Sequence, residues 1–130
     1  MGCIRGVICK GCGTKYEIRI GGGFTNHDLH CDKCGKLKSV SFGELGEIHL
    51  RFLKGLKIPY CVATMGYDKY VQEHYPREPI TENEYNRLTE EFVGKCECGG
   101  NFTFDAKPRC PNCRSVESEE DPNGKFILYD

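Results

Sequence analysis

An alternation of apolar and charged positions marks the first part of the chain. Tyr16, Ile18 and Ile20 alternate with charged residues, a period of two that is typical of a half-buried β-strand. The glycines at 21–23 predict a turn after this strand, and residues 37–42 have the pattern of the returning strand. The first 42 residues therefore predict a small β module built on a hairpin.

The last part of the chain repeats this pattern. Phe102 and Phe104 fall on one face of a predicted strand, residues 121–124 have turn composition, and residues 126–129 predict a further strand. Each end has few large apolar residues, so neither hairpin is expected to be stable without additional cross-links. We therefore expect a three-stranded β module at each end.

Between these ends, residues 43–94 show a helical period. Ser41 and Glu44 have the spacing of a capping box, and it precedes an apolar helical face formed by Leu45, Ile48 and Phe52. Residues 58–64 predict a short strand, and residues 67–75 predict one or two helical turns that Pro76 ends.

The clearest helix of this middle segment is predicted from about Glu82 to Val93. Thr81 and Glu84 form a second capping box, and Gly94 ends the pattern. The apolar stripe of this helix consists of Tyr85, Leu88 and Phe92. The middle of the chain is therefore an ordered α/β connector.

Cysteine content changes this picture of two weak modules. The chain has 10 cysteines in 130 residues, which predicts either disulfides or metal sites. The N-terminal residues lack the apolar run of a secretory leader, and no apolar run has the length of a membrane span. We therefore expect a soluble, cytoplasmic protein in a reducing compartment, where clustered thiols are most often metal ligands.

Eight of the cysteines form four close pairs along the chain. Each pair can occupy a tight turn that directs two sulfurs at one point, and two pairs supply the four ligands of a tetrahedral Zn²⁺ site. Taking the pairs in sequence order, we predict two zinc ions per chain, with glycines after the second cysteine where a positive φ is needed. The first predicted site is Cys9, Cys12, Cys31 and Cys34, and the second is Cys96, Cys98, Cys110 and Cys113.

Both cysteine sets resemble zinc ribbons of the rubredoxin-like type, and the stretch "CPNC" at 110–113 is close to the second knuckle of those proteins. The resemblance implies metal ligation by the eight cysteines and a scaffold rather than an activity. The chain departs from the pattern at Cys96 and Cys98, which are separated by one residue instead of two. Rubredoxins use such sulfurs for iron, with a longer gap between the pairs, so zinc is the expected metal here.

These observations predict an α+β fold with three segments. Residues 1–42 form an N-terminal zinc ribbon, residues 43–94 form the α/β connector, and residues 95–130 form a C-terminal zinc ribbon.

The remaining candidate residues favour structural roles. The two unpaired cysteines, Cys3 and Cys61, are most simply small buried apolar residues. A complete four-cysteine set leaves no vacancy for the nearby histidines, and the other two histidines have no evident partner, so we assign no catalytic role to His27, His30, His49 or His74. We expect the tyrosines of the middle segment to be core residues by default: Tyr60, Tyr67, Tyr70, Tyr75 and Tyr85.

Charge is distributed unevenly although the net charge is −1. Residues 1–60 carry 10 Lys and Arg against 5 Asp and Glu, whereas residues 61–130 carry 8 against 14. The basic excess of the first half suggests a nucleic-acid surface on the N-terminal ribbon, but the isoelectric point near 6.4 is lower than such modules usually have. An ordinary solvated surface is the simpler interpretation.

The expected function is non-catalytic. Closed four-cysteine zinc sites lack the open coordination position of zinc enzymes, and the sequence contains no phosphate loop, nucleophile elbow or histidine-glutamate metal motif. We therefore predict a protein-binding adaptor with two structural zinc sites and no membrane contact. Two alternatives stay open: nucleic-acid binding through the N-terminal ribbon, and a rubredoxin-like iron or dithiol redox protein.

Overall fold

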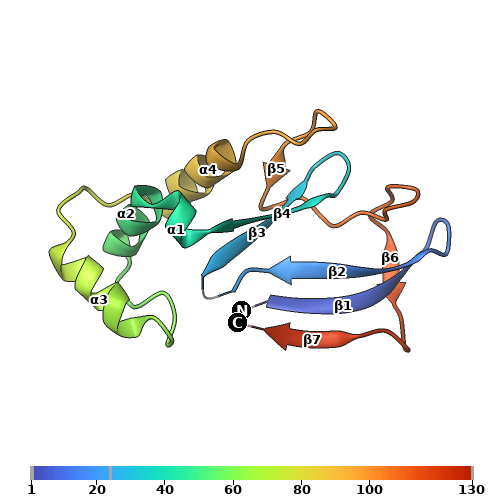
Figure 1. Ribbon diagram of the computed structural model, residues 1–130, viewed down its shortest axis with the longest axis horizontal. Helices are drawn as coiled ribbons and strands as arrows, with labels where there is room; N and C mark the ends of the chain where they lie inside the picture. The colour runs from blue at the N-terminus through green and yellow to red at the C-terminus, as the bar shows by residue number, and fades with distance from the viewer. Residues whose placement is uncertain (1, 24, 130) are drawn as a thin grey trace.

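The computed structural model describes residues 2–23 and 25–129, and it shows the expected mixed α+β fold. Two antiparallel sheets lie beside a group of helices, and the two ends of the chain meet in one of the sheets (Figure 1). Both sheets are built from strands of the first and last parts of the sequence.

The first sheet is centred on β1 (Gly2–Cys9). β2 (Lys15–Gly21) pairs with one edge of β1, and both β6 (Ser118–Glu120) and β7 (Phe126–Tyr129) pair with the other edge. In this register Gly2 lies opposite Tyr129, which places the N- and C-terminal strands side by side (Figure 1).

The second sheet has the order β4-β3-β5. Its central strand, β3 (Asn26–Cys31), pairs with β4 (Leu37–Ser41) and with the two-residue β5 (Phe102–Thr103). Strands are therefore present at the four expected places, near residues 16–20, 37–42, 102–104 and 126–129. They do not pair with one another as two separate hairpins, one at each end of the chain.

Sequence reasoning missed β1 and β3, the strands at the centre of the two sheets. β1 contains Gly2 and Gly6, and glycine is disfavoured in strand interiors. The structure explains Gly6, because an added Cβ there would lie 2.9 Å from Cα of Gly124 in the turn before β7. Such close backbone approach is a recognised reason for a glycine within a strand.

Strand pairing links the two terminal segments. β1 pairs with β6 and β7, and β3 pairs with β5, so each sheet uses strands from residues 1–42 and from residues 95–130. The expectation that each end forms its own three-stranded ribbon is therefore wrong, because strands of one end pair with strands of the other. The three segment boundaries themselves stay a prediction.

The helical region begins at the predicted capping box. Ser41 Oγ accepts a hydrogen bond from the Glu44 amide at 3.0 Å, and Glu44 Oε1 accepts one from the Ser41 amide at 3.0 Å. The expected single helix is divided into α1 (Phe42–Leu45) and α2 (Glu47–Gly55) because Gly46, at φ 57°, interrupts it. A positive φ is accessible to glycine at little cost.

α4 (Glu82–Val93) has the expected boundaries, whereas α3 (Met65–His74) is longer than the one or two expected turns and begins two residues before them. α3 ends before Pro76, and α4 begins after Thr81, whose side chain accepts a hydrogen bond from the Glu84 amide at 3.2 Å. Gly94, at φ 83°, ends α4. Within the described residues, no helix is both long and apolar enough to span a membrane.

The strand expected at residues 58–64 is absent from the structure, which has a loop there. Asp68 Oδ2 accepts a hydrogen bond from the Tyr60 amide at 2.8 Å and a longer one from the Cys61 amide at 3.5 Å. These amides therefore bond to a side chain instead of a neighbouring strand. The connector, which joins β4 to β5 within the second sheet, is therefore helical.

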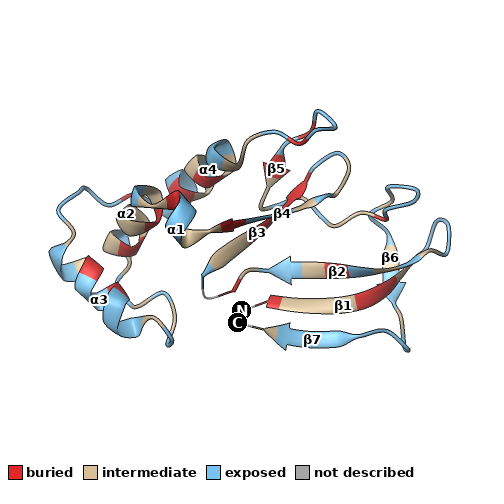
Figure 2. Cartoon of the chain, in the orientation of Figure 1, coloured by how far each residue is buried: buried red, intermediate tan, exposed pale blue. Residues whose placement is uncertain are grey.

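One hydrophobic core joins α1, α4 and the second sheet. Its buried members include Leu29, Val40, Tyr85 and Phe102, and two cysteines, Cys31 and Cys96, belong to the same cluster. The strands of the first sheet are less buried, and β7 is exposed over most of its length (Figure 2). The apolar core is therefore concentrated on the helical side of the molecule.

Candidate metal centre

Each of the four cysteine pairs lies in a tight turn. In three of them the residue after the second cysteine donates its amide to the carbonyl of the first cysteine: Gly13 to Cys9, Gly35 to Cys31 and Arg114 to Cys110, at 2.9 to 3.0 Å. These three residues have positive φ angles of 67° to 77°. The turn chemistry expected from the sequence is confirmed for the two glycines.

The fourth turn, Cys96-x-Cys98, is a one-residue-shorter form of the same structure. The Gly99 amide donates to the Cys96 carbonyl at 3.0 Å, and the Cys96 amide donates to the Gly100 carbonyl at 2.8 Å. Gly99 takes the positive φ, at 92°. Although this turn has one residue fewer between its cysteines, it still directs both sulfurs to one side.

The structure groups the four turns differently from the prediction. The sulfurs of Cys9, Cys12, Cys110 and Cys113 lie within 4.8 Å of one another, as do those of Cys31, Cys34, Cys96 and Cys98. We call these the outer group and the inner group, because the first and last pairs of the sequence enclose the second and third. The expected pairing in sequence order is wrong, since β1 runs beside the C-terminal strands and carries Cys9 away from Cys31.

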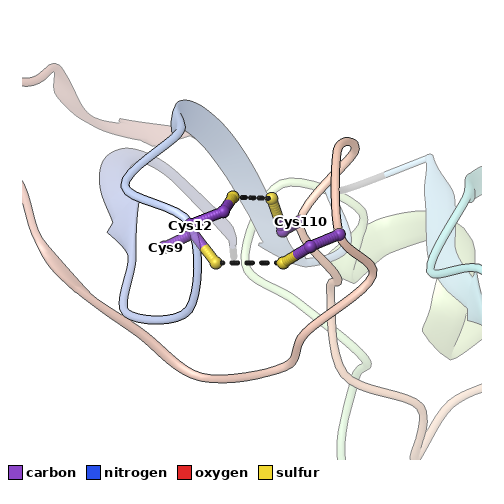
Figure 3. Close-up of side chains that lie close together, drawn as sticks. Cys9, Cys12 and Cys110 are labelled. Atoms are coloured by element: carbon purple, nitrogen blue, oxygen red, sulfur yellow. Dashed lines mark hydrogen bonds between the residues drawn. The ribbon is translucent and has the colours of Figure 1, made fainter.

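In the outer group, Cys9 Sγ lies 3.4 Å from Cys113 Sγ, and Cys12 Sγ lies 3.6 Å from Cys110 Sγ (Figure 3). The two pairs approach from opposite sides, one at the end of β1 and the other from the chain before β6. Cys9 and Cys110 are buried, whereas Cys12 and Cys113 are exposed. The group is therefore at the surface, with two of its four cysteines exposed.

In the inner group, Cys31 Sγ lies 3.4 Å from Cys98 Sγ, and Cys34 Sγ lies 3.6 Å from Cys96 Sγ. Cys31 and Cys96 are buried and only Cys98 is exposed. An added Cβ at Gly100 would lie 2.6 Å from Cys31 Sγ, so glycine is needed there for the backbone to pass the sulfur. This group is therefore packed more closely by its surroundings.

These distances suit a four-sulfur metal site. All ten cysteines are free, and a disulfide would require about 2.05 Å between sulfurs. Around a tetrahedral ion with metal–sulfur bonds of about 2.3 Å, neighbouring sulfurs lie about 3.8 Å apart. Each group could therefore hold one metal ion with small movements of its side chains.

Backbone amides stabilise negative charge on the first sulfur of each longer turn. Cys9 Sγ accepts from the Gly11 amide at 3.3 Å, and Cys110 Sγ accepts from the Asn112 amide at 3.4 Å. At Cys31, burial raises the thiol pKa, but hydrogen bonds from the Cys34 and Lys33 amides outweigh it and lower the pKa to about 6. A low pKa favours the thiolate, which is the form that binds metals.

Cys12 also favours the thiolate form. Its sulfur contacts Thr14 Oγ1 at 3.0 Å, and hydrogen bonds from Thr14, and then from Asn112, lower its pKa to about 6. Each group therefore contains at least one thiol that is easily deprotonated.

Two arginines connect the outer and inner groups. Arg109 Nη2 donates to the Asp32 carbonyl at 3.2 Å, and Arg114 Nη1 donates to the Cys34 carbonyl at 3.3 Å. Arg109 Nη1 also donates to the Arg114 carbonyl at 2.9 Å. The arginines flank Cys110 and Cys113, so they bridge the last turn of the outer group to the first turn of the inner group.

Sequence reasoning did not identify this bridge, although one signal was present. Arg114 stands where Gly13 and Gly35 follow the other Cys-x-x-Cys pairs, and it is the one non-glycine residue with positive φ in the described part of the chain. A left-handed conformation costs a non-glycine residue about 1–2 kcal/mol. The hydrogen bond from the Arg114 side chain to the Cys34 carbonyl gives a structural reason for arginine at this position.

Outside the two groups, Cys61 and two of the histidines make contacts of their own. Cys61 Sγ contacts Thr64 Oγ1 at 3.0 Å, and Cys3 lies within β1; both are half-buried. Tyr85 Oη contacts His27 Nε2 at 2.7 Å and His49 Nδ1 at 2.8 Å, so these histidines have packing roles. The partner of His49 could not be seen in the sequence, because Tyr85 is distant along the chain.

The expected core role of the tyrosines holds for one of them. Tyr85 is 2% exposed and stacks on Phe52 with ring centroids 4.0 Å apart. By contrast, Tyr60, Tyr67 and Tyr70 are 37%, 57% and 64% exposed.

Comparison with known proteins places the chain in a family. Searches of curated proteins and of solved structures find no match for this chain. A family model described as "Domain of unknown function (DUF8255)" matches residues 5–119, a range that contains all eight cysteines of the two groups and ends before β7. The chain therefore belongs to the DUF8255 family.

Proposed function

We propose that this protein is a non-catalytic adaptor in which two zinc ions, one in each cysteine group, hold together a surface that binds another protein. The observation that carries the proposal is the completeness of both groups, with four sulfurs gathered within 4.8 Å in each. Four thiolates fill a tetrahedral coordination sphere and leave no position for a substrate, as in structural zinc sites.

Zinc fits the donor set and the position of the groups. Thiolates are soft ligands, and tetrahedral four-sulfur sites select zinc or iron. Both groups join distant parts of the chain, since one connects residue 12 to residue 110 and the other connects residue 34 to residue 96. The bound ion would act as a cross-link that restricts the unfolded chain.

The exposed strand β7 supports a protein partner. Phe126, Ile127 and Leu128 are 60%, 46% and 65% exposed, and β7 has no strand on its other edge within residues 2–23 and 25–129. An open edge with consecutive apolar side chains is suited to pair with an extended segment of another chain. The proposed partner therefore adds a strand to the first sheet beside β7.

Metal content tests the first half of this proposal. Elemental analysis of the purified protein should find two zinc atoms per chain in a colourless solution. A red protein with iron and visible absorbance would support the redox alternative instead. One metal atom per chain, or none with all thiols intact, would contradict the proposal.

A substitution on β7 tests the second half. A partner identified by crosslinking to the native protein should be lost in Leu128→Lys, because a charged residue on an edge strand blocks pairing. Ile58→Lys is the matched control, since Ile58 is 73% exposed in the loop before α3 and should leave binding unchanged. Equal loss of the partner in both variants would contradict pairing at β7, and salt-sensitive binding of mixed nucleic acid by both would favour the nucleic-acid alternative.

A further inference from the structure

A cleft of about 570 Å³ lies between the start of the helical region and α3, away from both cysteine groups. Its lining includes Phe42 and His49 from the start of the helical region, Tyr60 from the loop before α3, and Tyr67 and Asp68 from α3. Its size lies within the range of about 300–1,000 Å³ that is usual for small-molecule sites. The proposed metal sites involve none of the residues that line this cleft.

Asp68 is the unusual residue of the cleft, because it is a charged residue with 2% of its surface exposed. Oδ2 accepts hydrogen bonds from Thr64 Oγ1 at 2.7 Å and from the Tyr60 and Cys61 amides at 2.8 and 3.5 Å. Oδ1 accepts no hydrogen bond from any described residue. One oxygen therefore holds the loop before α3, and the other is free on a residue that lines the cleft.

The charge of Asp68 is not balanced by a cation in the cleft. No lysine or arginine of the described chain lines it. Burial lowers the pKa of His49 to about 4, so this ring is neutral at pH 7. A buried carboxylate is costly unless a cation or further hydrogen bonds compensate it.

The other walls are aromatic. Phe42 stacks on His49 with ring centroids 3.9 Å apart, and Tyr60 meets Phe42 edge-on at 5.4 Å and 90°. Tyr67 stands at the rim with 57% of its surface exposed. Aromatic faces attract cations that are weakly hydrated, above all alkylated ammonium groups.

We propose that this cleft binds a small organic cation, an alkylated ammonium group on an apolar body, with Asp68 Oδ1 as its charge partner and the rings of Phe42, Tyr60 and Tyr67 around it. A metal ion fits less well, because calcium and magnesium need several oxygen ligands and Asp68 supplies the one carboxylate. An anion would be repelled by the same carboxylate. The proposal is independent of which metal the cysteine groups hold.

A titration with a shape-matched pair of probes tests the charge requirement. Choline and its uncharged carbon analogue, in which a carbon atom replaces the ammonium nitrogen, are added to the ¹⁵N-labelled, metal-loaded protein. We expect choline to shift the amide signals of residues 60–68 saturably and to bind about tenfold more tightly than the analogue. Equal binding of the two probes, or no saturable shift with choline, would overturn the proposal.

Variants test the residues. Asp68→Asn should weaken choline binding at least tenfold, while the analogue binds as before. Tyr67→Ala should weaken choline binding severalfold and Tyr67→Phe should not, because the ring supplies the attraction. Tyr70→Ala is the control, since Tyr70 lies on the same helix and is 64% exposed but does not line the cleft.

If Asp68→Asn fails to fold, the comparison of Tyr67→Ala with Tyr70→Ala still tests the proposal. Choline binding that is unchanged in Tyr67→Ala, or reduced equally in Tyr67→Ala and Tyr70→Ala, would overturn the assignment of the site.

Discussion

The inner and outer cysteine groups are chemically alike but lie in different surroundings. Cys31 and Cys96 of the inner group belong to the main apolar core, together with Leu29, Tyr85 and Phe102. The outer group lies at the end of β1 that pairs with β6, in a sheet whose edge strands β6 and β7 are mostly exposed. The same four-sulfur unit therefore reinforces an existing core at one site and substitutes for a core at the other.

This difference predicts how each region depends on metal. Around the inner group, helices and the second sheet bury apolar surface that is stabilising by itself. Around the outer group, few side chains besides Val7, Cys9 and Ile18 are buried in the first sheet. We therefore expect the first sheet to need its metal for folding and the helical core to retain part of its structure without metal.

Metal removal should have the largest effect and should separate the two regions. A strong chelator should remove stabilisation on the order of 10 kcal/mol for each site. Hydrogen exchange should then show loss of protection in β1, β6 and β7, while α4 keeps partial protection. Full protection of β7 after elemental analysis has confirmed metal loss would show that the outer group is not structural.

Single cysteine substitutions should distinguish the nested grouping from a grouping in sequence order. Cys110→Ser removes one ligand of the outer group, so residues 110–129 should lose exchange protection while residues 96–104 stay protected by the inner group. Cys31→Ser, at a fully buried position of the core, should instead reduce protection across α4 and the second sheet. Loss of protection at 96–104 in Cys110→Ser would contradict the nested grouping.

Acid should destabilise the helical core through the two histidines that contact Tyr85. Burial lowers the pKa of His27 and of His49 from 6.5 to about 4 in the folded protein. The unfolded chain therefore binds more protons between these values, and stability that is complete above pH 6.5 falls as the pH decreases toward 4. The loss should reach about 3 kcal/mol for each histidine.

A non-titrating variant isolates this effect from acid release of the metal. His27→Gln with His49→Asn keeps a polar nitrogen or oxygen near each contact with Tyr85 but carries no titratable group. Urea unfolding of the metal-loaded protein from pH 7 to pH 5 should show a smaller loss of stability in the variant. An equal loss of stability from pH 7 to pH 5 in the variant and in the unmodified protein would show that the histidines do not contribute to the acid sensitivity.

The smallest effect is expected at the bridge between the groups. Arg109→Ala removes the bonds to the Asp32 and Arg114 carbonyls and should reduce the free energy of unfolding by about 1–3 kcal/mol. Arg87→Ala is the control, because its exposed bond to Glu91 is worth about 0.5 kcal/mol or less. Equal losses in urea unfolding of the two variants would show that the bridge adds no stability.

The sequence by itself determined the local features of this protein. Capping boxes, a proline after α3 and glycines with positive φ are short-range signals, so the helix boundaries at Ser41, Thr81 and Gly94 and the turns at the cysteine pairs could be predicted. The eight grouped cysteines were identified for the same reason, because a close pair of thiols in a tight turn is a local motif.

Only the tertiary structure decided which turns face each other and which strands pair. Every cysteine pair offers the same two thiols, so donor chemistry does not distinguish the nested grouping from the sequential one. The choice depends on β1 lying against β6 and β7, with Gly6 allowing close contact with Gly124, and on β3 pairing with β5. Such pairings join residues from 71 to 127 positions apart, and their energy comes from side-chain packing and backbone bonds between segments that no short stretch of sequence contains.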